Sequence, residues 1–186
     1  MSSVAVQPIS GTFRAHPVPS SFAFGIRHSG VFWYRGSLSE VAATLRGDAQ
    51  GLVLEGSARV DSISVVEPPT LRAHLLGPDF FNVEHHPEIT FRSTSIDLSK
   101  TGGAEVQGEL TMRGLTRPVR AAGQYAGPRM SSFGELIGIE LHTSLDRREF
   151  GFDWQMQMPG GGDVVGWEVE IDIDLLLTRE ETDGPD

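Results

Sequence analysis

The stretch from Leu71 to Leu98, LRAHLLGPDFFNVEHHPEITFRSTSIDL, decides how the rest of the chain can be arranged. Pro68-Pro69 stand just before it and favour a helix start, because proline lacks the N–H that would be unpaired in a first helical turn. Gly77-Pro78 ends that helix, so one short helix is predicted over residues 69–76. Phe80-Phe81 follow at the turn, and the Ile-, Thr- and Phe-rich end of the stretch is typical of a strand. We therefore expect a single short helix between strands, with two phenylalanines pointing inward.

Outside this stretch, apolar and polar residues alternate along several short segments, as they do in half-buried β-strands. The alternation is clearest near the C-terminus, where Val169, Ile171 and Ile173 alternate with acidic residues. Segments 22–28 and 119–125 repeat the pattern, and glycine-rich turns separate such segments. Because closing a sheet on itself removes its unpaired edges, we predict an all-β fold, an antiparallel β-barrel of about eight strands with one short inserted helix.

The barrel is predicted to be one domain. We place it at residues 11–179, after a flexible N-terminal arm (1–10) and before an acidic tail (180–186). Within it, long strands are predicted over 32–46 and 52–66, and a turn over 127–134. Small residues at predicted inward positions should leave room inside the barrel; they are Ser93, Gly108, Ala121 and Gly123.

Composition excludes several classes of function. The net charge of −10 disfavours nucleic acid or an anionic membrane as a standing partner. No apolar run approaches the roughly 18 residues of a membrane helix. The first twenty residues lack the basic start and apolar core of a signal peptide, so we expect a cytoplasmic location. The chain has no cysteine, which excludes thiol catalysis and disulfides.

Several motifs, in order along the chain, resemble the YceI-like family. In the central stretch they are Ala73-His74-Leu75, Pro78-Asp79-Phe80-Phe81 and the run from His86 to Thr94; outside it they are Phe24–His28, Gly108–Pro118, Asp146-Arg147 with Phe150-Gly151, and Val164–Gly166 with Val169–Asp174. The resemblance extends over roughly residues 11–178. It implies a lipocalin-like barrel that binds polyisoprenoids or other long lipids, and it makes a homodimer plausible.

We find no arrangement of side chains typical of an enzyme or a metal site. The six histidines show no HExxH or comparable ligand spacing, so neither a metal nor a cofactor is predicted. The cluster Asp146-Arg147-Arg148-Glu149 is typical of a salt-bridged corner after a strand, and the resemblance gives it a structural role. We therefore predict no catalytic residues. Two alternatives remain open: a lipid-modifying enzyme that uses His28 or the Asp146-Arg147 corner, and a barrel without ligand that serves as a stress-response module.

Together these observations predict a protein that carries or stores one long apolar lipid, a polyisoprenoid or an isoprenoid quinone, inside the barrel, with transient membrane contact. The predicted ligand-binding residues are Phe22, Phe24, Ile26, His28, Phe32, Leu110, Met112, Trp154, Met156, Met158, Val169, Ile171 and Ile173. Most lie on one face of a predicted strand. The tryptophan and the last two methionines precede three glycines and are predicted to form a movable lip, because methionine adapts to irregular apolar partners. His28 is predicted to face a lipid headgroup through its match to the family motif.

Overall fold

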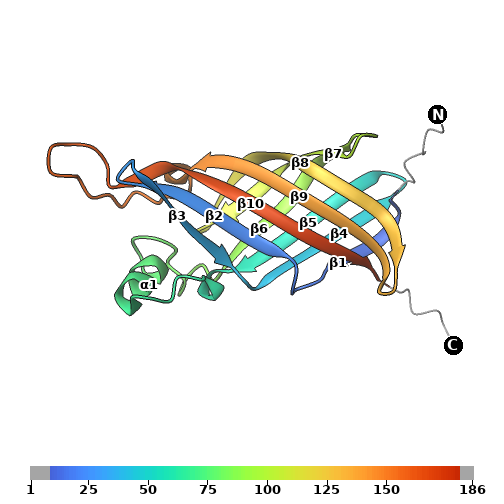
Figure 1. Ribbon diagram of the computed structural model, residues 1–186, viewed down its shortest axis with the longest axis horizontal. Helices are drawn as coiled ribbons and strands as arrows, with labels where there is room; N and C mark the ends of the chain where they lie inside the picture. Colours follow the sequence, from blue (N-terminus) through green and yellow to red (C-terminus); the bar gives the residue numbers. More distant parts are fainter. Residues whose placement is uncertain (1–8, 181–186) are drawn as a thin grey trace.

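The computed structural model describes residues 9–180 of the chain. Most of the predicted arm and of the acidic tail, residues 1–8 and 181–186, therefore lies outside the described residues. The strands are β1 (Gly11–Ala15), β2 (Ser21–His28), β3 (Phe32–Leu38), β4 (Val41–Asp48), β5 (Gly51–Arg59), β6 (Glu88–Leu98), β7 (Gly103–Met112), β8 (Leu115–Ser131), β9 (Gly134–Asp146) and β10 (Val165–Arg179). The helices are α1 (Pro69–Leu76) and two short 3₁₀ turns, η1 (Val60–Ser62) and η2 (Arg147–Phe150). Figure 1 shows them wound around one axis.

Eight strands close into a ring in the order β1-β4-β5-β6-β7-β8-β9-β10, and β1 returns to pair with β10. All of these pairs are antiparallel. The eight-stranded lipocalin-like barrel predicted from the sequence is confirmed. The other two strands lengthen the wall: β10 pairs with β1 through residues 177–179 and with β2 through residues 165–174, and β3 pairs with β2.

Three predicted elements end elsewhere. The strand predicted over 32–46 breaks after Leu38, where the Ser62 hydroxyl accepts hydrogen bonds from the backbone N–H groups of Ser39 and Glu40. The strand predicted over 52–66 stops at Arg59, and η1 follows. The turn predicted over 127–134 is shorter, because β8 continues to Ser131 through a bulge between Ala126 and Arg129. The bulge accommodates the proline at position 128, which has no N–H for the ladder.

The helix predicted over residues 69–76 is confirmed as α1, with proline at its first position and Gly77 as its C-cap. Arg72 fastens it by donating hydrogen bonds to the backbone carbonyls of Asp61, Ile63 and Val65. Together with the β2–β3 turn and the segment 152–164, α1 lies at one end of the barrel, which we call the helix end; the β8–β9 turn lies at the far end (Figure 1). Within residues 9–180, no helix is both long and apolar enough to cross a membrane.

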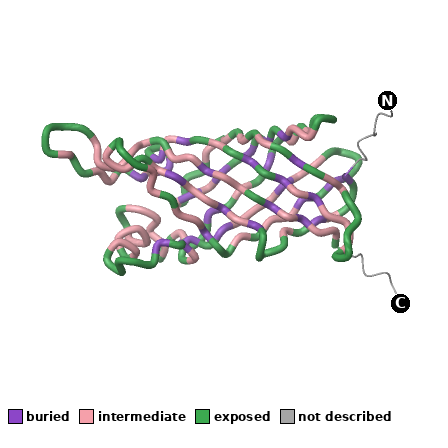
Figure 2. The backbone as a smooth tube through the Cα atoms, viewed as in Figure 1, coloured by how far each residue is buried: buried purple, intermediate pink, exposed green. Residues whose placement is uncertain are grey.

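The two ends of the barrel are filled differently. The far end contains a packed core in which Phe13, Leu45, Ile137 and Leu177 are fully buried. The helix end also contains buried residues, but many of its apolar side chains, including those of α1, are only partly buried. Figure 2 shows buried positions running along the strands and mostly exposed or half-buried ones at the helix end. Side chains therefore fill the barrel at one end and only line it at the other.

Candidate functional site

A cavity of about 520 Å³ lies inside the helix end of the barrel. Its wall combines β2, β3, α1, the turn that follows α1, the segment 152–165 and the first half of β10. Apolar side chains make up nearly all of that wall; those with a polar group are His28, Tyr34, His74, Arg147 and Trp154. Phe32 and Met156 line the cavity and are also 48% and 55% exposed, so they mark its mouth.

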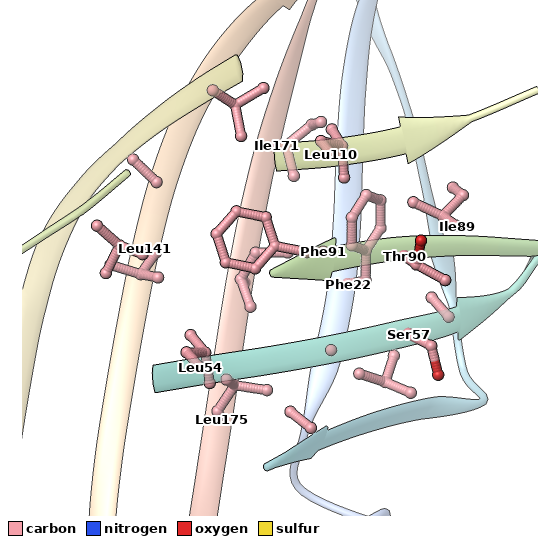
Figure 3. A pocket seen from close by; sticks show the side chains of 18 of the residues that line it. Phe22, Leu54, Ser57, Ile89, Thr90, Phe91, Leu110, Leu141, Ile171 and Leu175 are labelled. Carbon is pink, nitrogen blue, oxygen red and sulfur yellow. The ribbon is translucent and has the colours of Figure 1, made fainter. Parts of the chain in front are cut away.

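A second, smaller cavity of about 100 Å³ lies deeper in the barrel. Phe22, Ile89 and Ile171 border both cavities, so the two lie end to end. The far wall of the small cavity includes Leu54 and Leu141, which belong to the packed far-end core. Figure 3 shows these side chains converging on the small cavity from strands on several sides of the barrel.

The structure gathers almost all of the predicted ligand-binding residues around these two cavities. Ten of them line the large cavity: Phe22, Phe24, Ile26, His28, Phe32, Met112, Trp154, Met156, Val169 and Ile171. Leu110 and Ile173 line the small one. Whether these side chains contact a ligand stays a prediction, but the strand faces from which they were chosen do point inward.

Met158 is the exception, since it lines neither cavity. The alternation from Trp154 to Met158 predicted one continuous face, but the segment 152–164 contains no strand. The chain reverses at the glycines, with Met158 N–H donating to the carbonyl of Gly162 and Gly161 N–H donating to the carbonyl of Met158. The Met158 side chain lies over this turn, outside the walls of both cavities, and its contact with a ligand at the lip stays a prediction.

Several wall residues were missed, because no local pattern identifies them. Tyr34 lies on β3 opposite Ile26 of β2, so only knowledge of the strand pairing brings it into the cavity. Burial raises the pKa of the Tyr34 hydroxyl above its ordinary value. Leu71, His74 and Leu75 line the cavity from α1, which covers part of the opening. Leu71 and Leu75 are four residues apart and so share one helical face, but this spacing does not show what the face would contact.

An aromatic cluster joins α1 to the segment 152–164 at one side of the mouth. The His74 ring lies 5.0 Å from the Phe80 ring and 4.9 Å from the Trp154 ring, in edge-to-face arrangements in both cases. Phe80 and Trp154 lie 5.4 Å apart, which completes the triangle. Next to this cluster, the rings of Phe81 and Phe152 meet edge to face, with their centres 5.2 Å apart. The two phenylalanines predicted to point inward therefore close the cavity on this side.

The Asp146-Arg147 corner holds the wall in place. Arg147 is only 3% exposed and donates hydrogen bonds to the backbone carbonyls of Phe152 and Gly166, with a longer contact to Val165. Desolvation on burial lowers the pKa of its guanidinium. The side chain of Asp146 accepts hydrogen bonds from the backbone N–H and the guanidinium of Arg148. Both bonds lower the pKa of the Asp146 carboxyl, and the bond from the guanidinium lowers it more. The predicted ion pair at this corner is therefore between Asp146 and Arg148.

The small inward residues do not simply leave empty space. A side chain at Gly108 would collide with the ring of Phe91, and one at Gly123 would collide with the backbone carbonyl of Glu140. The hydroxyl of Ser93 accepts a hydrogen bond from the Leu54 backbone. Of these four residues only Ala121 lines a cavity. The expectation that small residues create the lumen was wrong at the glycines, where they allow close approach.

Comparison with known sequences is consistent with this architecture. The sequence profile of a family described as YceI-like domain matches residues 13–177. A UPF0312 protein of Ectopseudomonas mendocina is 30% identical over 132 residues, which make up 68% of each chain. A UPF0312 protein of Staphylococcus aureus is 26% identical over 166 residues, covering 87% of this chain and 94% of the relative.

Solved structures share the fold. BcnA of Burkholderia cenocepacia matches with a TM-score of 0.71 and 18% identity, over 87% of this chain and 98% of that one. A polyisoprenoid binding domain from Saccharophagus degradans matches with a TM-score of 0.66 and 10% identity, over 92% of this chain and 100% of that one. At these identities the likeness concerns the fold alone. The family profile, in contrast, spans most of the sequence, and the chain belongs to the YceI-like domain family.

Proposed function

We propose that this protein binds one long apolar molecule, a polyisoprenoid or an isoprenoid quinone, in the barrel and carries or stores it. The observation behind this proposal is the cavity of about 520 Å³ whose wall is almost entirely apolar. Each CH₂-sized group moved from water into such a cavity contributes about 0.8 kcal/mol. A chain of several isoprene units therefore gains enough free energy to stay bound without any charged contact.

Exchange with a membrane follows from the same energetics. An isoprenoid chain is already in an apolar environment in a bilayer, so its transfer into the barrel changes the hydrophobic free energy little. The protein would then retain its cargo in water and release it at a membrane. Val31, Phe32 and Met156 are 77%, 48% and 55% exposed at the β2–β3 turn and in the segment beside it. Phe32 and Met156 border the mouth, and all three apolar side chains would contact the bilayer during exchange.

The comparisons support the proposal through the fold. The Saccharophagus degradans domain, described as polyisoprenoid binding, has the same architecture. Its identity of 10% leaves the choice of ligand to experiment. The predicted homodimer and the cytoplasmic location stay predictions.

Mass spectrometry of an organic extract from the purified protein tests the proposal. We expect an isoprenoid lipid at close to one molecule per chain. Val169→Trp should abolish it, because Val169 lines the large cavity and a tryptophan there would occupy much of the space. Glu168→Trp is the matched control, since the neighbouring Glu168 is exposed and absent from the cavity wall. Absence of any stoichiometric lipid, or equal lipid in both variants, would contradict the proposal.

A further inference from the structure

The interior of the barrel is closed at the far end. A chain that enters at the mouth meets the large cavity, then the small one, and then the far-end core, where Phe13, Leu45, Ile137 and Leu177 are fully buried. In that core, apolar side chains from several strands pack against one another, and the small cavity ends at this core. An apolar chain in the barrel therefore has a limited length.

The volumes give that length. A cavity of about 150 Å³ accommodates benzene, which corresponds to roughly 25 Å³ per carbon atom. At this packing, the large cavity of about 520 Å³ and the small one of about 100 Å³ together hold about 20 to 25 carbon atoms. This corresponds to four or five isoprene units.

Phe91 lies where the lumen stops. It lines the small cavity and packs against both the helix-end core and the far-end core. Its ring occupies the place that a side chain at Gly108 would take, since a Cβ there would lie 2.5 Å from the ring Cζ atom. Figure 3 shows the ring extending into the small cavity, on the same side as Leu54 and Leu141. Gly108 thus gives Phe91 room to lie across the lumen at the boundary between the hollow and the filled part.

We propose that Phe91 sets the maximum chain length of the cargo, and that the barrel selects apolar chains of about 20 to 25 carbons. This inference rests on the proposed function. Carbons beyond the capacity of the lumen would protrude from the mouth into water. Because every isoprene unit is shielded from water in the bilayer, each unit that protrudes from the barrel lowers the extraction of a lipid from a membrane at least roughly tenfold.

Extraction from vesicles measures this selection. The full chain is incubated with phosphatidylcholine vesicles that contain equimolar prenols of 15 to 40 carbons, and the protein-bound fraction is identified by native mass spectrometry. For the unmodified protein we expect efficient extraction up to about 25 carbons and a drop of roughly tenfold or more for each further unit.

Two variants should move the limit in opposite directions. Phe91→Ala removes six ring carbons at the floor and should raise the limit by about one isoprene unit. Ala121→Leu adds three carbons to the wall of the small cavity and should lower it. Filling a cavity also makes this second variant the safer one for folding. Phe133→Ala makes the same truncation at an exposed side chain that lines neither cavity, so it is the control and should leave the limit unchanged.

The outcomes separate the two proposals. Efficient extraction of 40-carbon prenols by the unmodified protein, or a limit that neither Phe91→Ala nor Ala121→Leu changes, would overturn the role of Phe91. Failure to extract a prenol of any length would instead contradict the proposed function. Circular dichroism checks that each variant retains its strands, so that a change in the maximum chain length is not confused with unfolding of the variant.

Discussion

Arg147 provides a direct test of how the wall of the cavity is held together. Its guanidinium joins the end of β9 to both the segment 152–164 and the start of β10, through the backbone carbonyls of Phe152, Gly166 and, at 3.4 Å, Val165. The ring of Trp167 lies 4.2 Å from the same guanidinium. Arg147→Ala removes the donor while the carbonyls stay buried in the wall.

The magnitude follows from these contacts. A hydrogen bond to a charged group contributes about 1.5–3 kcal/mol, and Arg147 makes two well-placed bonds and one long one. Part of the loss is offset, because a buried cation is itself costly to desolvate. We expect Arg147→Ala to lower the free energy of unfolding by about 2–5 kcal/mol, which corresponds to a melting temperature lower by about 5–15 °C.

Urea denaturation followed by far-ultraviolet circular dichroism measures this loss. Arg148→Ala is the control, because the Arg148 side chain is 54% exposed and solvent screens its ion pair with Asp146. Arg147→Lys should recover little, since an ammonium group cannot reproduce the planar fork of donors. A loss for Arg147→Ala no larger than that for Arg148→Ala would refute the view that these bonds hold the wall.

Two further predictions concern acid stability and membrane exchange. The Arg148 guanidinium lowers the pKa of Asp146 in the folded protein. The ionised carboxylate therefore stabilises the fold at pH values above the pKa of the unfolded chain, about 3.9. This stabilisation is lost as the pH falls through the lower pKa of Asp146 in the folded protein. Asp146→Asn should therefore flatten the dependence of unfolding free energy on pH below about 4, measured by urea titrations; an unchanged slope would contradict this assignment. The double variant Phe32→Ser/Met156→Ser should slow transfer of bound lipid to phosphatidylcholine vesicles at least roughly threefold when it and the unmodified protein are compared at equal lipid loading, as these side chains border the mouth. Phe133→Ser is the control, because Phe133 is 81% exposed at the far end, and it should leave the transfer rate unchanged. Equal transfer rates for the double variant and the unmodified protein would exclude a role of the mouth.

The interior of this barrel is filled with side chains at one end and hollow at the other. Such a barrel has an interior that side chains can just fill, or that can hold one small ligand. Here the far end is filled, and the helix end is extended by β2 and β3 beyond the strands β1 and β4 that close the ring. The extra wall and the cover of α1 enclose a space that the ring alone would not contain. A packed floor and a roomy mouth in one barrel follow from this extension.

Much of the architecture could be predicted from the sequence, because the signals are local. The prolines before position 70 and Gly77 set the bounds of α1, since both residue types act on the backbone within one turn. The alternation of Val169, Ile171 and Ile173 with acidic residues determined which face of β10 lies inside, since a strand has a period of two. The predicted wall residues on β2, β7 and β10 lie on the inward face for the same reason.

Only the tertiary structure decided where along the barrel axis the interior is hollow and where it is filled. A period of two assigns a side chain to the inside but does not say whether its neighbours across the lumen will fill the space there. That depends on the register of strands far apart in the sequence, which brings Phe91 of β6 over Gly108 of β7 and leaves Ile26 and Tyr34 facing a cavity. Met158 lines neither cavity for a related reason: the segment 152–164 forms only an isolated bridge between Gln157 and Asp163, so the chain turns back on itself beside Met158 and does not continue as a strand along the wall.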